Sequence, residues 1–214
     1  TKMVDFPGSR PGVGSAPRGN VYAFAREGGA PVILQENRDA EVTDLLPQPN
    51  GDFYAAIVFS TTSNESRLTP PASATKAGAK DEPPPPPPAQ VERFGGRSSV
   101  IWFPAQGFPE VLAARANTAV YRLQRRGDLL LMAGGEQGEL LGYDLATRLS
   151  VTFSGSVSSQ LNGFTPLPGG GTDAAPGRYL LLRNNAPGFA VLDFAAGGPR
   201  EAETRRLDLA TASQ

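Results

Sequence analysis

The chain has 214 residues, a formal net charge of −1, and neither cysteine nor histidine. Its near-neutral charge argues against a nucleic-acid partner, and no apolar run approaches the roughly 18 residues that cross a bilayer. The missing residue types exclude disulfides, Cys or His metal ligands, and Ser-His or Cys-His catalytic pairs. We therefore expect no catalytic residue, no metal and no cofactor in this chain, no nucleic-acid partner and no membrane span.

Along the chain, short apolar runs alternate with turn residues. The 25 glycines and 21 prolines suit such a turn-rich chain. Residues 1–18 are rich in Gly, Pro and Ser without periodicity, and they predict an extended lead-in. Turns then recur roughly every 10 residues, which is typical of an all-β fold. The first predicted strands are NVYAFAR (20–26), VILQ (32–35), EVTDLL (41–46) and DFYAAIVF (52–59).

The strand pattern then returns with a regular spacing. SVIWFPA (99–105) resembles NVYAFAR, and the run that starts at Ser99 is followed 40 residues later by one that starts at Glu139. Self-similarity at this period indicates stacked supersecondary units. Independent hairpins of a β-sandwich are the alternative interpretation. We predict four-stranded antiparallel meanders at 19–59, 97–137 and 138–187, with a partial unit at 188–214.

A proline-rich stretch, residues 60–97, interrupts this pattern. Its six consecutive prolines, Pro83 to Pro88, can form neither a helix nor a central strand, because each lacks a backbone donor and has a fixed φ. Removing the stretch restores the period, so we interpret it as an insertion loop that connects two units of one architecture. A proline-binding partner is an alternative use of this segment.

One stretch in the second half of the chain carries the most specific pattern. VYRLQRRGDLLLMAGGEQGELLGYDLATRLSVTF resembles bacterial β-propeller repeats of the WD, PQQ-like or NHL-like kind. The shared features are a Gly-Asp turn (127–128), a Gly-x-x-Gly turn (135–138) and an "lYdl" strand (140–145). The sequence departs from the WD type, since Trp102 is followed by Phe103 and not by Asp.

This resemblance implies an all-β fold, a β-propeller segment of three to four four-stranded antiparallel blades. The complete ring would have about seven or eight blades. The missing blades would come from more of the same polypeptide, from a cleaved companion fragment or from a partner chain, and an oligomer is one of the possible states. Similar bacterial propellers are often exported, so the resemblance also implies a periplasmic or extracellular location.

Two groups of charged residues are candidates for a binding site. The acidic group around the start of a predicted strand would suit a divalent cation with oxygen ligands, and it consists of Asp39, Glu41 and Asp44. A solvated turn is the simpler interpretation of this group. The basic group in and beside a predicted hairpin would suit an anionic ligand, and it consists of Arg122, Arg125 and Arg126 with Arg115 upstream. A solvated strand surface is the simpler interpretation here.

Amide side chains form a third group, near the ends of predicted strands. The resemblance to propellers implies that loops at one rim bind ligands, although Asn is also a common turn residue that tolerates left-handed backbone. Aromatic residues inside strands, among them Tyr54 and Trp102, are expected to pack in the core between blades. The amide candidates are Asn117, Gln160, Asn162, Asn184 and Asn185.

These features favour a non-catalytic binding or scaffold module that presents its loops to a protein or a small ligand. Two alternatives stay open. The chain can be part of a propeller enzyme of the lactonase, lyase or quinoprotein type, with its active residues in blades outside this chain. It can also be a structural component of an extracellular or envelope assembly.

Overall fold

The computed structural model describes residues 2–6, 10–25, 27–59, 94–135, 138–154, 160–168, 171–172, 175–184 and 188–194. All regular secondary structure in these residues is β-strand, which confirms the predicted all-β class. Among them, no helix is long and apolar enough to cross a membrane.

Three four-stranded sheets follow one another along the chain, and a three-stranded and a small two-stranded sheet complete the described part. Consecutive strands of each four-stranded sheet are antiparallel neighbours, so each of these sheets is a meander. The first sheet contains β1 (Lys2–Phe6), β2 (Arg10–Gly14), β3 (Val21–Ala23) and β4 (Val32–Gln35); the second contains β5 (Ala40–Pro47), β6 (Phe53–Phe59), β7 (Arg97–Phe103) and β8 (Glu110–Ala116); the third contains β9 (Val120–Arg126), β10 (Leu129–Gly134), β11 (Glu139–Asp144) and β12 (Ser150–Ser154); the fourth contains β13 (Gln160–Pro166), β16 (Arg178–Asn184) and β17 (Gly188–Asp193); and the small one contains β14 (Gly171–Thr172) and β15 (Ala175–Pro176).

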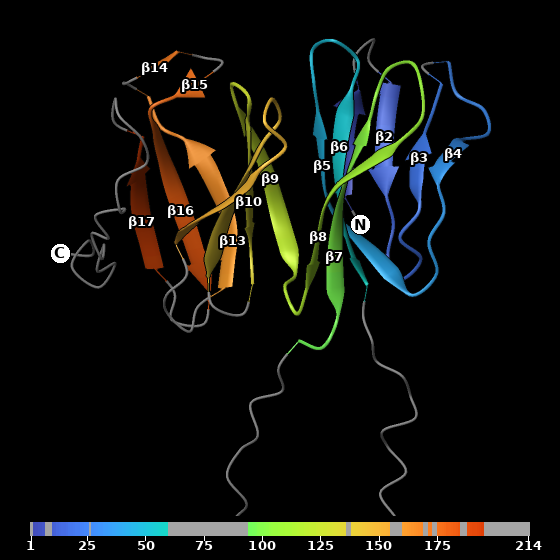
Figure 1. The fold of residues 1–214 in the computed structure, drawn as a ribbon. Coiled ribbons are helices and arrows are strands. Elements are labelled where there is room, and N and C mark those ends of the chain that lie inside the picture. Colours follow the sequence, from blue (N-terminus) through green and yellow to red (C-terminus); the bar gives the residue numbers. More distant parts are fainter. Residues whose placement is uncertain are drawn as a thin grey trace, which may run out of the picture.

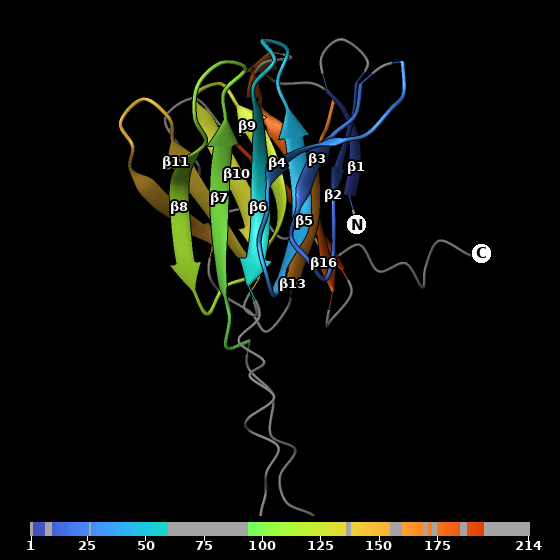
Figure 2. The ribbon, with the colours of Figure 1, turned by 90° about the vertical axis from the view of Figure 1, so that its right-hand side faces the viewer.

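The four larger sheets stack face to face, as Figure 1 shows from β4 at one end of the row to β17 at the other. The first strand of each sheet, namely β1, β5, β9 or β13, packs beside the first strand of the next. In Figure 2, β8 lies at one side of the second sheet and β5 at the other. We call the first strands β1, β5, β9 and β13 the inner strands, because β5 contacts β1 and β9, and β9 contacts β13. Stacked meanders whose first strands gather on one side are the arrangement of β-propeller blades.

Apolar side chains on both faces of the middle strands drive this stacking. β6 and β10 read FYAAIVF and LLLMAG and are buried over most of their length, as expected for strands that are covered on both faces. One apolar cluster fills each gap between neighbouring sheets. Leu45 and Ile57 belong to the first cluster, Met132 to the second, and Leu131 and Leu181 to the third.

The predicted extended lead-in at residues 1–18 is wrong, because β1 and β2 lie within it. The glycines of β2 hid this strand from the sequence pattern, and they make room for a side chain of the second sheet and for one of the same sheet. A Cβ built on Gly14 would lie 2.3 Å from Cγ1 of Val42, and one on Gly12 would lie 2.4 Å from the Phe6 ring. Only glycine fits where backbone approaches a neighbouring side chain this closely.

The sheets also divide the chain differently from the predicted units. Each predicted unit begins two strands later than a sheet does, so that β3 to β6 were expected together. Residues 60–93 lie outside the described residues, but the strands on either side of them are neighbours, with Phe59 opposite Arg97. The proline-rich insertion therefore connects adjacent strands of the second sheet, and not two blades. A repeat period gives the spacing of the units, but it does not show which strand begins each unit.

Candidate functional site

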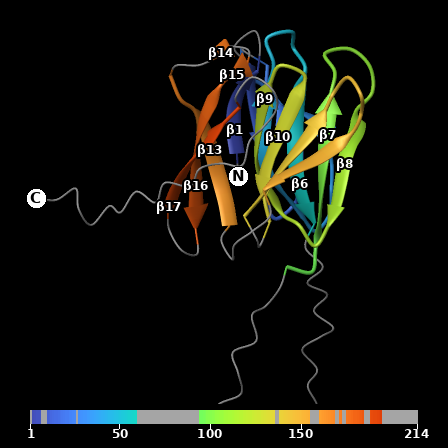
Figure 3. The same cartoon turned by 60° about the vertical axis from the view of Figure 1, so that its left-hand side comes forward.

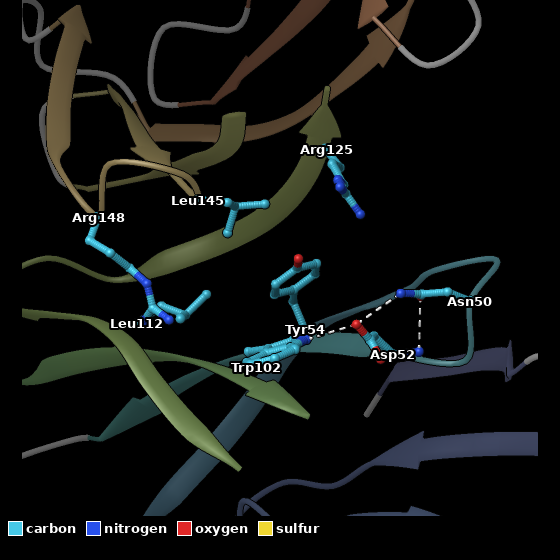
Figure 4. Close-up of a pocket in the computed structure, with 8 residues that line it drawn as sticks. All are labelled: Asn50, Asp52, Tyr54, Trp102, Leu112, Arg125, Leu145 and Arg148. Carbon is cyan, nitrogen blue, oxygen red and sulfur yellow. Dashed lines mark hydrogen bonds between the residues drawn. The ribbon is translucent and has the colours of Figure 1, made fainter. Parts of the chain in front are cut away.

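A pocket of about 220 Å³ opens between the second and third sheets. It lies at the edge of the sheets where the β5–β6, β9–β10 and β11–β12 turns gather, at the top of Figure 1. Side chains from both sheets face it in Figure 4. The residues that line it are Asn50, Asp52, Tyr54, Trp102, Leu112, Arg125, Leu145 and Arg148.

Two aromatic side chains from neighbouring strands line one side of the pocket. Tyr54 of β6 and Trp102 of β7 are directly opposite in the sheet register, so that their side chains share one face of the second sheet. Leu112 and Leu145 approach from β8 and from the turn after β11. Aromatic and aliphatic side chains therefore make up one half of the pocket lining, and polar or charged side chains make up the other.

Asp52 fixes the position of the Trp102 ring. The turn that carries Asp52 contains Gly51 with φ of 93°, a left-handed conformation that favours glycine. The Asp52 carboxylate accepts hydrogen bonds from Trp102 Nε1 at 3.2 Å, from the Ala105 amide at 2.9 Å and from Asn50 Nδ2 at 3.0 Å. Three donors thus compensate one carboxylate, and the indole ring is held against the pocket.

Two arginines stand at the pocket. Arg125 Nε donates to the Gly127 carbonyl at 2.8 Å, and its NH1 group donates to Gln48 Oε1 at 3.1 Å. Arg148, in the β11–β12 turn, pairs with the carboxylate of Glu110 at the start of β8. The hydrogen bond to Glu110 is the largest cause that raises the pKa of Arg148. Both guanidinium groups are oriented by hydrogen bonds before any ligand arrives.

Tyr54 presents its hydroxyl group to the pocket, on the side of Leu145 and Arg125 (Figure 4). Burial raises the pKa of Tyr54, and the nearby Arg125 lowers it by a smaller amount. The phenol is therefore protonated at neutral pH and can donate a hydrogen bond.

A second polar feature ties the inner strands together. Asp44 of β5, whose side chain is 6% exposed, accepts from the Leu123 amide of β9 at 2.8 Å. Its other oxygen lies 3.0 Å from Lys2 Nζ of β1 and 3.3 Å from Arg122 NH1 of β9. Thr43, beside it, donates to the Val120 carbonyl at 2.5 Å. One buried carboxylate thus links the first three sheets.

Four of the predicted site residues lie at one edge of the second sheet, opposite the pocket. Asp39 precedes β5 and Asn117 follows β8, with φ of 54° and 55°. The backbone N–H of Asn117 donates to the Gly96 carbonyl at 2.8 Å. Glu41 and Arg115 lie near the same ends of β5 and β8. The two positive φ values agree with the turn interpretation of Asp39 and Asn117.

The other predicted residues do not join this group. Arg122 belongs to the Asp44 contact between inner strands. Gln160 and Asn184 are opposite each other at one end of the fourth sheet. Asn162 lies at an irregularity of β13, and its Oδ1 atom is buried with no hydrogen-bond partner in the part of the chain that the structure describes. Asn185 lies outside the described residues.

The sequence pattern assigned Tyr54 and Trp102 to core packing and did not identify the pocket, although Arg125, one of its candidates for an anionic ligand, lines it. Both residues are indeed strand residues between sheets. Their direct pairing depends on β6 and β7 being neighbours across residues 60–93, which the predicted unit boundaries excluded. Among the described residues, no group of three or more His, Cys, Asp or Glu side chains could hold a metal ion.

No family model and no curated protein sequence matches the chain. Among solved structures, the major allergen Mala s 1 of Malassezia sympodialis aligns with a TM-score of 0.50 at 8% identity, over 91% of this chain and 60% of the allergen. That allergen is a β-propeller. The fold of this chain is of the β-propeller type. The chain thus spans less than two thirds of the propeller that it matches.

A second solved structure, the cobalt-substituted apocarotenoid oxygenase of Synechocystis, aligns at 14% identity with a TM-score of 0.42, over 82% of this chain and 38% of the oxygenase. The predicted membership of a bacterial propeller repeat family of the WD, PQQ-like or NHL-like kind is wrong, because no repeat family matches and the structural similarity extends to the fold alone. Export to the periplasm or the exterior stays a prediction.

Proposed function

We propose that this chain is a non-catalytic binding module of a β-propeller, and that the pocket between the second and third sheets is its ligand site. The observation that carries the proposal is the pairing of Tyr54 with Trp102 beside a volume of about 220 Å³. This volume is below the roughly 300 Å³ at which small-molecule pockets usually begin. The pocket therefore suits a single ring or one protruding side chain and not a whole cofactor.

The polar groups around the pocket favour an anionic end on this ligand. Asp52 already accepts three hydrogen bonds, so it offers little to a cationic ligand. Tyr54 has a protonated hydroxyl, and the nearby Arg125 supplies positive charge, whereas the charge of Arg148 is shared with Glu110. A carboxylate could accept from these donors, since charge-assisted hydrogen bonds to guanidinium groups are stronger than neutral ones.

Exposed apolar residues on nearby turns favour a protein as the source of that group. Phe108, in the β7–β8 turn that also provides Ala105, is 91% exposed, and Leu149, in the turn that carries Arg148, is 64% exposed. Exposed apolar side chains near a concave site are typical of binding surfaces. We infer that the ligand is an aromatic or aliphatic side chain near a carboxylate, presented by a partner protein.

Binding is favoured over catalysis by the state of the pocket's own charged groups. Asp52 accepts from three donors, and Arg148 is paired with Glu110. A general base must be able to reach and remove a proton from the substrate, and a carboxylate that already holds an indole and a backbone amide is poorly suited to that task.

Trp102 is the only tryptophan of the chain, so intrinsic fluorescence reports directly on the pocket. We would titrate the protein with 3-phenylpropionate, and with phenethylamine and propionate as probes that lack the carboxylate or the ring. The expected result is saturable binding of 3-phenylpropionate, with affinity at least about tenfold higher than for either control probe, a difference of about 1.4 kcal/mol.

Two variants test the geometry. Tyr54→Phe removes the donor in the pocket and should weaken 3-phenylpropionate binding about fivefold or more, in line with the loss of one hydrogen bond to a charged group. Tyr22→Phe, on β3 of the first sheet, is the matched control and should bind like the wild type. Equal, unsaturable quenching by all three probes, or unchanged affinity in Tyr54→Phe, would refute the proposal.

A further inference from the structure

The first sheet has an apolar row on the face that no described strand covers. Met3, Val13, Tyr22 and Ile33 are consecutive partners in the register, one from each of its four strands. Their neighbours along the strands, such as Val4 and Val21, face the second sheet. Met3 is 71% exposed and Ile33 52%. We name Met3, Val13, Tyr22 and Ile33 the first open face.

The fourth sheet has a corresponding row at the other end of the stack (Figures 1 and 3). Tyr179, Leu181 and Leu192 pack against the third sheet, so the residues between them along the strands point the other way. Leu182, the most exposed of these, is 38% exposed. Two cross-strand pairs make up this surface, which we name the second open face: Leu180 with Val191, and Leu182 with Phe189.

The two open faces are complementary in the stacking order. In each internal interface, the forward face of one sheet, which is turned toward the next sheet in the chain, packs on the backward face of that next sheet. The first open face is the backward face of the first sheet, and the second open face is the forward face of the fourth sheet. Among the described strands, β13 packs against β9, β10 and β16 and makes no comparable packing with β1.

We propose that a second copy of this chain covers both faces. The second open face of each copy would pack on the first open face of the other, which continues the internal stacking order across both junctions. A two-fold axis makes the two junctions identical and leaves no open face. The result is a ring of eight sheets, within the range of about four to eight blades that propellers form. This inference does not depend on the pocket.

The test measures the mass of the native particle as a function of concentration, by light scattering and native mass spectrometry. The wild type should shift from 22.4 kDa to twice that mass as concentration rises to about 100 µM, an affinity accessible to weak dimers. Ile33→Lys and Leu182→Lys each place a charge in both junctions, so each should raise the dissociation constant at least about tenfold. Val111→Lys puts the same charge on β8, the outer strand of the second sheet, where the side chain is 57% exposed and away from both faces, and this variant should dimerise like the wild type.

Each other outcome overturns the proposal. A wild type that stays monomeric at about 100 µM would show that other polypeptide covers these faces or that nothing does. A dimer that responds to only one of the two lysine variants would be joined through a single face, and masses beyond two copies would indicate an open chain of subunits. Retained cooperative thermal unfolding is the check that the variants fold, and Ile33→Gln and Leu182→Gln replace any variant that does not.

Discussion

The interface between the first and second sheets is filled by three rings, whereas the next interface holds a pocket at the corresponding place. Phe53 stacks on Phe6 at 4.5 Å and on Phe103 at 4.4 Å. One residue away on the same two strands, Tyr54 and Trp102 form the equivalent pair on the other face. From the third sheet, Leu145 and Arg125 line the pocket beside this pair. The side chains of the neighbouring sheet therefore decide whether an aromatic pair of β6 and β7 is packed in the core or borders a pocket.

The largest expected effect comes from opening the filled interface. Phe53→Ala removes the central ring of the stack and should lower the free energy of unfolding by about 3–5 kcal/mol, the range for Phe→Ala in packed cores. Tyr54→Phe, next to it on the pocket side, should cost less than about 1 kcal/mol, because its hydroxyl faces the pocket. Urea unfolding followed by circular dichroism measures both. Similar losses in the two variants would contradict the contrast between the interfaces.

Most strands could be predicted from the sequence, but their grouping could not. VILQ is predicted at 32–35 and is β4, and the runs at 41–46 and 52–59 correspond to β5 and β6. Apolar runs between turn residues are local signals, and they remain visible whatever the strand pairs with. Pairing is not local, and a meander looks alike from any starting strand. β2 gave no signal, because its Gly12 and Gly14 leave room for Phe6 and Val42 and break the apolar pattern. β1 has an ordinary strand sequence, but it was interpreted as part of the same Gly- and Pro-rich lead-in.

The candidate site was harder to predict than the fold. The amide and charged residues chosen near strand ends are placed at turns and sheet edges, as with Asn117. The pocket instead uses strand residues such as Tyr54 and Trp102, whose pairing spans the proline-rich insertion. An aromatic residue in a strand reads as core in a single sequence, and only the register and the neighbouring sheet show which ring borders a cavity.

A medium effect is expected from the polar contact that joins the inner strands. Asp44→Ala would leave the Leu123 amide without its acceptor and would remove the partner of Lys2 and Arg122. Because both cations are partly exposed, we expect a loss of about 2–3 kcal/mol, below the range for a fully buried pair. Asp44→Asn keeps an acceptor for the amide and should cost less.

The control for Asp44→Ala is Asp128→Ala. The Asp128 side chain is 76% exposed, and its Oδ1 atom lies 3.9 Å from NH2 of Arg125. Exposed pairs of this kind contribute less than about 1 kcal/mol. The comparison also separates the two interfaces, because Asp44 spans both while the three stacked rings belong to one. A loss for Asp44→Ala no larger than that for Asp128→Ala would show that apolar packing alone holds the inner strands.

The smallest effect is expected from a change in the β11–β12 turn, which borders the pocket between the second and third sheets. The Asp144 carboxylate accepts from the amides of Ala146 at 2.9 Å and Thr147 at 2.8 Å. It thereby holds the turn that places Leu145 and Arg148 at the pocket. The hydrogen bond from the Thr147 amide is the main cause that lowers the pKa of Asp144 from its ordinary value of 3.8.

A lowered folded-state pKa means that this contribution is complete above the unfolded value of about 3.9 and disappears as pH falls through the folded value. Asp144→Ala should therefore have a lower Tm than the wild type at about pH 7, and the difference should shrink toward zero in acid below about pH 3. Trp102 fluorescence, recorded in the same scans, shows whether the pocket loosens with the turn. A Tm difference that is the same in acid and at neutral pH would mean that the ionised carboxylate does not hold this side of the pocket, and that the turn depends on its backbone hydrogen bonds alone.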